Sequence, residues 1–593
     1  MSAAKATTKA TTKVTANATA NAAAKAAALS TGAGLLIAAI LYACAVTDNS
    51  VKDYEEKAPV DAALRSAPFS KGVNFSGWFE SFSAQSIPFT KYTEEDFANV
   101  KSLGADVIRL PVKMHSMTGP APNYSLDPLL FKFLDQAVGW AEKYGLYIII
   151  DNHSFDPVKG IDDDIDRILL PVWDQVSRRY KDRSDFIVYE ILNEPHGISD
   201  RRWGEVQGMA IQTIRKNDTK HAVIAGGTDY NSIEKLSAIP RYSDTNVIYT
   251  FHFYDPYLFT HQGANWGGPP VLVSLAGLPF PAEGRRMPRI PADLKGTWIE
   301  SSLNYSYAKD ASAEKIYSAL DKAAAFSRER DVPVFCGEFG VYLIQSPKED
   351  RALWYRIVSA ALDRRNISRT SWDYYGGFGI FNTQARGDFF SDLNTDVVRA
   401  MGFTPPVQTP RSQTQRPRTG GFIIYGDYPD RDVSVSSWGE GIDLSLYETS
   451  SASGEFAIRW GNVSRYNSLS FVFDFGGDFS GYLSEDYCLE FKARTLNPSR
   501  FDVRFLNPES SSSIPWRMYY EINENILPPD GRWHTIRIPL KDMREHGAWL
   551  SSKQQWLSPQ GKFSWEKIAA LEFTAEYSDF SHRVFFDDIK ITK

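Results

Sequence analysis

The stretch Ile191-Leu192-Asn193-Glu194-Pro195 joins an apolar run to a carboxylate and a proline. A second stretch of the same kind, Phe335-Cys336-Gly337-Glu338-Phe339-Gly340, lies much later in the chain. Both apolar runs predict buried β-strands, and in each case the glutamate comes at the end of the run. Only a fold that gathers distant strand ends on one face can bring these two carboxylates together.

Between residues 60 and 403, eight β-branched or aromatic runs alternate with helical patterns. This alternation predicts a closed (β/α)8 TIM barrel, an α/β fold whose active sites lie at the carboxyl ends of the strands. A doubly wound open sheet is the alternative, but it gives no reason for polar groups at all eight strand ends. The expected strands are Val73–Phe79, Asp106–Val112, Leu146–His153, Phe186–Asn193, Ala222–Gly226, Val247–Tyr254, Val334–Phe339 and Arg369–Tyr374. The expected helices include Leu129–Tyr144, Arg167–Tyr180, Trp203–Lys216, Ala313–Arg330 and Arg351–Arg364.

The expected strand ends are far more polar than the rim of a purely structural barrel requires. Two carboxylates facing each other are what hydrolysis of a glycosidic bond needs, because one protonates the leaving oxygen and the other acts at the anomeric carbon. The residues at these ends are Arg109, His153, Asn193, Glu194, His252, Tyr254, Glu338 and Trp372.

Taken in order, these eight residues resemble the set shared by glycoside hydrolase family 5, the retaining (β/α)8 cellulases and mannanases. The resemblance covers roughly residues 60–403. It implies that Glu194 is the acid/base, that Glu338 is the nucleophile, and that catalysis requires no cofactor. The matching strings are Ile108-Arg109-Leu110-Pro111, Asp151-Asn152-His153, Leu192-Asn193-Glu194-Pro195, His252-Phe253-Tyr254, Gly337-Glu338-Phe339-Gly340 and Ser371-Trp372.

The other polar strand ends are expected to support the two glutamates. A nucleophile must be ionised, so Arg109 and Tyr254 are expected to stabilise the charge of Glu338. The pKa of Glu194 is expected to be higher, since this group must donate a proton first and accept one later. Asn193 is expected to bind a sugar 2-hydroxyl.

Several further residues complete the expected cleft. His153 and His252 are expected to orient the catalytic groups, and Trp372 offers a flat apolar face for a pyranose ring. The segment from Tyr257 to Asp310 is too long for an ordinary loop and carries Trp266, so it is expected to form a wall of the cleft. Glu190 is interpreted as a carboxylate of the barrel interior that has its own partner.

The composition excludes some classes of partner and site. Acidic residues outnumber basic ones by 72 to 65, and the net charge of −7 argues against a nucleic-acid partner. The three cysteines cannot form a disulfide framework, and no cluster of cysteine and histidine has the spacing of a zinc site. No metal site is therefore expected in the barrel.

Residues 1–50 form a low-complexity segment that resembles an export signal. Residues 1–25 carry lysines and no acidic residue, and no charge occurs from Ala26 to Val46. A basic stretch before an apolar core is typical of secretory signals. Three interpretations stay open: a lipoprotein acylated at Cys44, a signal cleaved after Ala43-Cys44-Ala45, and an uncleaved anchor. All three predict an extracellular or surface-anchored protein that contacts a membrane only through this segment.

A second domain is expected after the Pro-rich linker, residues 404–420. Short strands recur through residues 421–593 and predict an all-β jelly-roll sandwich. The segment Gly531–Leu540 and the ending Phe585-Phe586-Asp587-Asp588-Ile589 resemble carbohydrate-binding modules of the family 11 type. Trp516, Tyr519 and Tyr520 are the candidate sugar-stacking aromatics. A structural calcium is expected to suit Asp587 or Asp588 together with Asp427.

Together these features predict an endo-β-1,4-glucanase that hydrolyses cellulose or mixed-linkage β-glucan by a retaining mechanism and carries a glucan-binding sandwich. The polysaccharide is the expected partner, and the chain is expected to act as a monomer. A β-mannanase, glucomannanase or xyloglucanase on the same barrel is the first alternative. A non-catalytic polysaccharide-binding surface protein is the second, and the presence of both glutamates with their supporting residues counts against it.

Overall fold

The computed structural model describes residues 61, 63–154, 158–384, 386–410, 420–439, 441–510 and 513–593. All of them belong to the second of two compact units, Val60–Lys593. The predicted signal-like segment, including Cys44, lies outside the described residues. Within them, no helix is both long enough and apolar enough to cross a membrane.

Eight parallel strands close into a barrel in chain order, which confirms the predicted (β/α)8 fold. The strands are shorter than expected at several ends because the polar residues that follow them leave the sheet for the loops. The strands are β1 Lys71–Asn74, β2 Val107–Val112, β3 Tyr147–Asn152, β4 Ile187–Glu190, β5 Ala222–Gly226, β6 Val247–Phe253, β7 Val334–Phe339 and β8 Ser368–Ser371.

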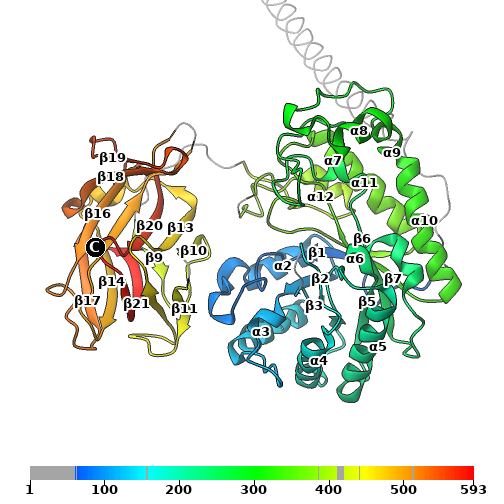
Figure 1. The fold of residues 1–593 in the computed structure, drawn as a ribbon, viewed down its shortest axis with the longest axis horizontal. Coiled ribbons are helices and arrows are strands. Elements are labelled where there is room, and N and C mark those ends of the chain that lie inside the picture. Colours follow the sequence, from blue (N-terminus) through cyan, green and yellow to red (C-terminus); the bar gives the residue numbers. More distant parts are fainter. Residues whose placement is uncertain are drawn as a thin grey trace, which may run out of the picture. The chain divides into compact units, whose positions relative to one another are not determined.

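Helices surround the strands, and Figure 1 shows α3, α4 and α5 along the outside of the barrel. Local signals fix the start and end of α3: the Asp127 side chain accepts from the Leu129 amide at 2.8 Å, Pro128 comes first, and Gly145 ends the helix in a left-handed conformation. The helices of this domain are α2 Glu94–Ser102, α3 Pro128–Tyr144, α4 Asp166–Tyr180, α5 Asp200–Asn217, α6 Thr228–Asn231, α7 Tyr257–Thr260, α8 Trp298–Tyr305, α9 Tyr307–Asp310, α10 Ala313–Arg330, α11 Lys348–Arg364 and α12 Thr395–Ala400.

The barrel interior changes from apolar to charged along the strands. Residues two apart on a strand point to the same face, so one strand can supply both layers. The apolar layer closes one end of the barrel together with Phe69 and Phe335. The charged layer lies next to the strand ends that carry the candidate catalytic groups. The successive buried pairs are Val107 and Arg109, Ile149 and Asp151, and Val188 and Glu190.

The C-terminal domain consists of two antiparallel sheets, which confirms the predicted all-β sandwich. A seven-stranded sheet runs in the order β10-β13-β20-β15-β16-β18-β19, and a six-stranded sheet contains β11-β12-β21-β14-β17 with β9 paired to β21. The strands are β9 Phe422–Tyr425, β10 Val433–Trp438, β11 Asp443–Glu448, β12 Ala457–Val463, β13 Ser468–Gly477, β14 Cys488–Thr495, β15 Phe501–Leu506, β16 Arg517–Ile522, β17 His534–Pro539, β18 Arg544–Leu550, β19 Gln555–Leu557, β20 Ile568–Thr574 and β21 Phe580–Thr592, with a short helix α13 Ser480–Ser484.

The first part of the predicted linker packs on the barrel. The Thr404 amide donates to the carbonyl of Leu103 at 2.9 Å, and the Thr409 amide donates to the carbonyl of Phe390 at 2.7 Å. These bonds hold residues 404–409 against the barrel, so this part of the predicted linker does not act as a spacer. Residues 411–419 lie outside the described chain.

Candidate active site

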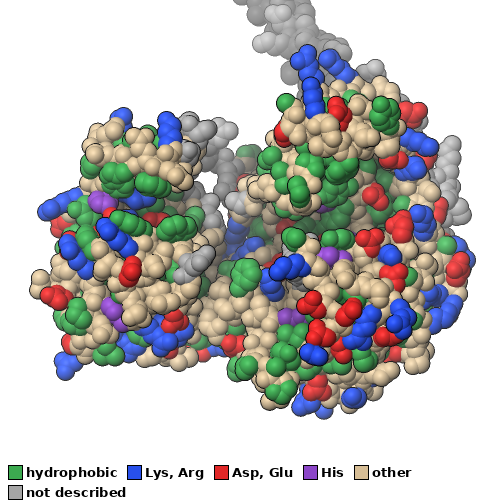
Figure 2. All heavy atoms as spheres, viewed as in Figure 1, with side chains coloured by type: hydrophobic (Ala, Val, Ile, Leu, Met, Phe, Trp, Pro, Cys, Tyr) green, Lys and Arg blue, Asp and Glu red, His purple; other side chains and the backbone are tan. Residues whose placement is uncertain are grey.

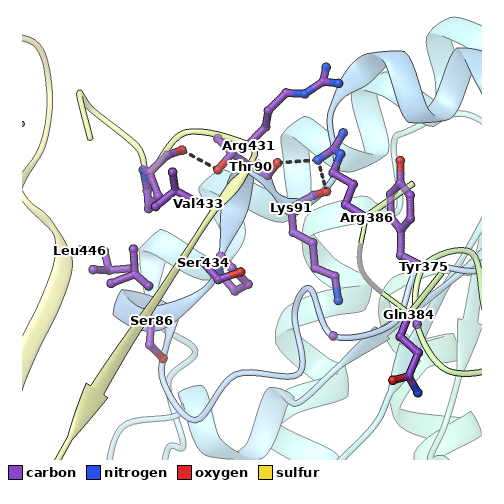
Figure 3. Close-up of a pocket in the computed structure, with 15 residues that line it drawn as sticks. Ser86, Thr90, Lys91, Tyr375, Gln384, Arg386, Arg431, Val433, Ser434 and Leu446 are labelled. Atoms are coloured by element: carbon purple, nitrogen blue, oxygen red, sulfur yellow. Dashed lines mark hydrogen bonds between the residues drawn. The ribbon is translucent and has the colours of Figure 1, made fainter. Parts of the chain in front are cut away.

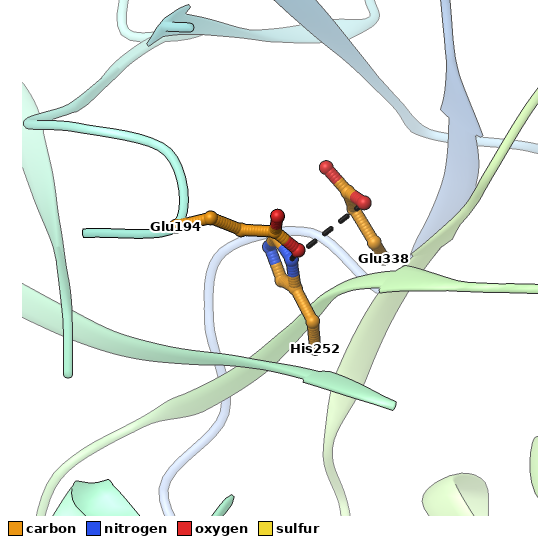
Figure 4. A group of neighbouring side chains, drawn as sticks. All are labelled: Glu194, His252 and Glu338. Carbon is orange, nitrogen blue, oxygen red and sulfur yellow. Dashed lines mark hydrogen bonds and ion pairs between the residues drawn. The ribbon is translucent and has the colours of Figure 1, made fainter. Parts of the chain in front are cut away.

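The two glutamates predicted to be catalytic face each other across His252. Glu194 follows β4 in a left-handed backbone conformation (φ 45°), and Glu338 lies near the end of β7. Nδ1 of His252 is 2.8 Å from Oε1 of Glu194 and 3.6 Å from Oε2 of Glu338. Ligand-type atoms of the three residues all lie within 4.8 Å of one another (Figure 4). The carboxylates are therefore close enough to act on one bond.

Arg109 lies under this pair, fully buried, and holds several side chains at once. Its guanidinium donates to Oε1 of Glu338 at 2.8 Å and to both carboxylate oxygens of Glu190 at 2.7 and 2.9 Å. It also donates to Oδ1 of Asn193 at 2.7 Å and pairs with Asp151 at 3.0 Å. A planar group with five donors suits this task, which a lysine cannot perform.

Glu190 behaves as the interpretation from sequence expects. Both of its oxygens accept from Arg109, so it is a barrel-interior carboxylate with a partner. Burial raises its pKa to about 7, against the charge of Arg109. Asp151 and Asn74 belong to the same network and are not among the residues predicted from sequence. Asn74 Oδ1 accepts from Arg109 at 3.0 Å, and its amide nitrogen donates to the carbonyl of Gly337 at 3.1 Å.

His153 is fixed between an acid and an indole. Nδ1 lies 2.7 Å from Oδ2 of Asp151, and the ring stacks on Trp372 with centroids 5.7 Å apart. Burial alone would lower its pKa, but the charge of Asp151 and the hydrogen bond to it raise the pKa to about 9. Its Nε2 is 3.3 Å from the Asn193 amide nitrogen. Trp372 is half-buried, and the His153 ring covers part of its indole.

Tyr254 supports the second oxygen of the nucleophile. Its hydroxyl donates to Oε2 of Glu338 at 2.9 Å, while Arg109 binds Oε1. Burial and the charge of Glu338 raise the pKa of Tyr254 well above its usual range, so the hydroxyl keeps its proton. The Glu338 carboxylate thus has a cation on one oxygen and a hydroxyl donor on the other. These donors suit an ionised nucleophile rather than a metal ligand.

Glu194 has the environment of a proton donor. Burial raises its pKa to about 7, and the charges of His153 and Arg109 oppose the rise. Burial lowers the pKa of His252 to about 4, so the imidazole is neutral above that pH and can donate one N–H to Glu194. The raised pKa therefore lets Glu194 carry a proton close to neutrality, as a general acid must.

The short segment α6 after β5 has a left-handed and not a regular helical backbone, and it supplies residues that the sequence did not single out. Asp229, Tyr230 and Asn231 all have positive φ, at 57°, 59° and 56°. Three successive non-glycine residues in this region store backbone strain, which clusters at functional sites. The strained turn directs Asn231 toward His252, with 3.4 Å between their side-chain nitrogens, and stacks the Tyr230 ring on His196 at 4.1 Å. An Asp-Tyr-Asn sequence after a strand was the available signal.

The long segment between β6 and α10, which the sequence predicts to be a wall of the cleft, brings Trp266 close to the aromatic residues around Tyr254. Trp266 is 42% exposed and meets Tyr342 edge-on, with centroids 4.8 Å apart. Tyr254, Trp372, Tyr342 and Phe378 pack into one small apolar cluster next to it. Figure 2 shows hydrophobic side chains lining a hollow in the barrel on this side. The wall therefore offers apolar faces close to the nucleophile.

The candidate aromatics of the sandwich do not share one face. Trp516 is 5% exposed, so the prediction that it stacks on a sugar is wrong, because a buried ring has no free face. Tyr520 pairs with the buried Val503 and packs against the core. Tyr519 pairs with Arg504 on the outer face of the seven-stranded sheet and remains a candidate.

The residues expected for calcium do not fit such a site. Asp587 accepts from the amides of Ala452 and Ser453, and Asp588 pairs with Lys492 at 2.6 Å. Asp427 accepts from the amide of Phe456 at 2.9 Å. Among the described residues, the one group of three side chains with metal-ligand atoms close together is Glu194, His252 and Glu338.

Comparison with protein-family models decides the family of the barrel. Residues 66–377 match the model described as Cellulase (glycosyl hydrolase family 5). The chain belongs to glycosyl hydrolase family 5. Endoglucanase 3 of Fibrobacter succinogenes is 28% identical over 336 residues, which span 52% of this chain and 50% of that protein. Endoglucanase C of Acetivibrio thermocellus is 26% identical over 336 residues, 53% of this chain and 94% of that one.

Among solved structures of the family, the endoglucanase Cel5A from Thermotoga maritima aligns with a TM-score of 0.47 and 25% identity, over 56% of this chain and 96% of that one. The chain spans half the length of the Fibrobacter relative and nearly all of the Acetivibrio one.

The sandwich belongs to a different module type from the one predicted. Residues 434–593 match the model described as Carbohydrate binding domain 30, so the family 11 assignment is wrong. The motifs behind that assignment lie in β17 and β21, strands of the six-stranded sheet whose alternating buried residues build the core. Core strands of related sandwiches look alike, and the differences lie on the faces that they expose.

Proposed function

We propose that this family 5 enzyme is an endo-β-1,4-glucanase that hydrolyses cellulose or mixed-linkage β-glucan with retention of configuration. The observation that carries the proposal is the short separation of Glu194 and Glu338, whose nearest oxygens lie within 4.8 Å. Retaining enzymes have carboxyl groups about 5 Å apart, whereas inverting enzymes need roughly 6.5–9.5 Å to admit a water. Residues 60–403 are the proposed catalytic domain and residues 421–593 the proposed binding module.

In the proposed first step, Glu338 attacks the anomeric carbon and Glu194 protonates the departing glycosidic oxygen. Arg109 and Tyr254 orient the attacking carboxylate through hydrogen bonds of 2.8 and 2.9 Å. Formation of the ester removes the negative charge of Glu338, which makes ionisation of the nearby Glu194 easier. Glu194 then takes a proton from water, and this water hydrolyses the ester.

The pH dependence of kcat/KM is expected to follow the protonation of Glu194. We expect kcat/KM to fall about tenfold per pH unit above pH 7, because the acid, with a pKa of about 7, loses its proton there. The measurement is kcat/KM for a β-glucan between pH 4 and 10. Formation of the ester from a dinitrophenyl cellobioside by Glu194→Ala should lack this limb, since that leaving group needs no proton. A wild-type profile that stays flat to pH 9 would contradict the assignment.

The substrate is tested by a panel. Reducing-sugar release on carboxymethylcellulose, mixed-linkage β-glucan, glucomannan, xyloglucan and mannan separates a glucanase from the alternatives. The proposal expects the first two to be the best substrates, and a strong preference for mannan or xyloglucan would favour the first alternative. A complete site, with acid, nucleophile and their partners, speaks against the non-catalytic alternative. Family membership supports hydrolysis without a cofactor.

For the sandwich, we infer that the outer face of the seven-stranded sheet binds β-glucan. Trp549 and Trp556 are paired across β18 and β19 and are 41% and 42% exposed. The His546 ring lies 4.7 Å from Tyr519 and 5.2 Å from Trp556. Exposed aromatic faces beside polar groups suit stacking on pyranose rings. Figure 2 shows hydrophobic side chains gathered over the region of β16, β18 and β19.

Replacing one of these rings tests the binding face. Trp556→Ala should weaken binding of soluble β-glucan by about 1.5–3 kcal/mol, the value of burying one large apolar side chain. Affinity electrophoresis of the full chain in β-glucan gels is the measurement. Trp533→Ala is the matched control, because Trp533 lies beside β17 on the other sheet and packs against Arg494. Equal mobility of the two variants would remove the face from consideration.

Export remains a prediction that rests on the sequence of residues 1–50. We keep Cys44 as the proposed acylated residue, with a cleaved signal and an uncleaved anchor as alternatives, and mass spectrometry of the N-terminal peptide distinguishes the three. A polysaccharide substrate supports a location outside the cytoplasm. We propose that the enzyme acts as a monomer.

A further inference from the structure

A cavity of about 390 Å³ lies between the barrel and the sandwich. Its walls come from the loop after β1, the loop after β8 and strand β10, as Figure 3 shows. The volume falls in the range of small-ligand sites. Among the described residues that line it, hydroxyl, amide and cationic donors occur and no carboxylate does. The polar lining includes Ser86, Thr90, Lys91, Gln384, Arg386 and Ser434.

Specific contacts hold the sandwich against the β1 loop. The buried Tyr447 hydroxyl donates to the carbonyl of Ile87 and accepts from the amide of Phe89 at 3.3 Å. Thr90 donates to the carbonyl of Pro429 at 2.7 Å. The Tyr447 ring also packs against Phe133 of α3, with centroids 4.8 Å apart. A buried hydroxyl with two partners and close ring packing is typical of a fixed interface, so the cavity walls belong together.

Hydrogen bonds link the wall of the cavity to the residue that follows Trp372 in the catalytic site. Lys91, on its wall, donates to the carbonyl of Ser76 at 2.9 Å, and Ser76 donates to Asp373 at 2.5 Å. Asp373 follows Trp372, the proposed sugar platform. Gly77 and Gly376 also line the cavity, with φ of 64° and 134°. Since glycine has no side chain, the backbone itself forms the cavity wall at these two positions.

The position of Glu194 indicates on which side of the cleaved glycosidic bond the cavity lies. An acid that protonates the leaving oxygen has the leaving-group sugars next to it, and His196 lies there, with Nδ1 2.9 Å from the Glu194 carbonyl. Trp372 and the β1 loop are linked through His153, whose ring stacks on Trp372 with centroids 5.7 Å apart, and the lining of the cavity does not include His196. Glu80 of that loop is 3.7 Å from Nε2 of His153. The cavity therefore continues the glycone side, toward the non-reducing end of a bound chain.

The outer face of the sandwich continues from the cavity. Strand β10 is the last strand of the seven-stranded sheet, and Ser434 on it lines the cavity. Directly paired residues point to the same face of a sheet. A row of such pairs crosses the sheet from the cavity to Arg517, whose guanidinium lies 5.8 Å from the Trp556 ring. The row is Ser434, Val472, Ala570, Leu506 and Arg517.

We propose that this cavity is a glycone-side subsite for the same glucan chain that occupies the cleft, with one wall supplied by the binding module. The inference rests on the proposed function and extends it. One polysaccharide chain then runs from Trp372 through the cavity and across β10 to the aromatic rings of the sandwich. A lining of hydroxyl, amide and cationic groups is polar enough for sugar hydroxyls, and a neutral chain needs no carboxylate there.

The test places a large side chain in the cavity by a substitution on strand β10 of the sandwich. Ser434→Trp changes an exposed residue outside the barrel, and Thr535→Trp, exposed on β17 of the other sheet, is the matched control. We expect Ser434→Trp to lower kcat/KM on cellohexaose about tenfold, the value of one or two lost hydrogen bonds, and to leave an aryl β-cellobioside unaffected. With reducing-end-labelled cellohexaose, cleavage should move toward the non-reducing end, so the labelled products become longer.

The possible outcomes distinguish failure of the proposed subsite from failure of the proposed glucanase activity. If wild type cleaves cellohexaose and Ser434→Trp matches Thr535→Trp in rate and product pattern, the subsite is absent. If wild type leaves cellohexaose and β-glucan intact, the proposed glucanase activity fails and the subsite with it. Thermal unfolding checks that both variants are folded. Ser434→Glu, which narrows the cavity with a smaller side chain, repeats the test if the tryptophan variant does not fold.

Discussion

Glu338→Gln is expected to lower kcat on every substrate by on the order of 10⁴-fold to 10⁶-fold, as removal of a covalent nucleophile does in other hydrolases. The amide keeps the size of the side chain, and its one oxygen can still accept from Arg109, which bonds Glu338 at 2.8 Å. Its NH2 group can donate to the Tyr254 hydroxyl oxygen, which lies 2.9 Å from the second carboxylate oxygen of Glu338. Folding should therefore survive while nucleophilic attack is lost. Steady-state kinetics on β-glucan and on an aryl β-cellobioside, with thermal unfolding, measure both.

A control variant and the configuration of the first product test the role of Glu338 further. Glu283→Gln changes an exposed glutamate in the long segment before α10 and should retain full activity. Early-time proton NMR of wild-type products should show the β-anomer first, because two displacements at one carbon restore its configuration. An α-anomer appearing first would reject Glu338 as nucleophile together with the retaining mechanism.

Glu194→Ala is expected to act differently on different leaving groups. On β-glucan, kcat/KM should fall by about 10²-fold to 10⁴-fold, the usual value of a general acid. A dinitrophenyl cellobioside has a leaving group that needs no proton, so it should form the ester on Glu338 in a rapid burst and then stall. The missing base explains the stall, since Glu194 is the group proposed to activate the water.

Azide distinguishes this stall from general damage to the site. A small anion can enter the space left by the Glu194 side chain and attack the ester without a base. Added azide should restore turnover of the dinitrophenyl substrate and yield a β-glycosyl azide. The same salt should give no rescue of Glu338→Gln, which forms no ester. An absence of both burst and rescue in Glu194→Ala would assign the acid/base role elsewhere.

The sequence by itself determined the barrel and the position of Glu194 and Glu338 at strand ends that come together. Strand alternation and the motifs around Glu194 and Glu338 are local, because the pattern of buried positions and a polar residue at a strand end are written in consecutive residues. The same holds for Glu190, whose position on a strand between apolar neighbours indicates an interior carboxylate with a partner.

The tertiary structure alone decided how the polar residues share partners. Arg109 was predicted beside Glu338, but its simultaneous bonds to Asp151, Glu190 and Asn193 depend on two other strands, β3 and β4, and the residues after β4 arriving at one layer. The left-handed turn at Asn231 and its approach to His252 likewise depend on where β5 and β6 end in space. No pattern in one strand specifies which neighbour a buried donor will meet.

The sandwich shows the same limit more clearly. Tyr519 and Tyr520 are adjacent on one strand, so they point to opposite faces, and a shift of one residue would exchange them. The sequence shows two aromatic rings, and only the pairing of Tyr519 with Arg504 and of Tyr520 with Val503 decides which ring lies on the outer face and which packs against the core. The contact of Tyr447 with the β1 loop joins residues 360 apart in the chain. Such contacts arise from packing of whole domains, because nothing local in either segment encodes its partner.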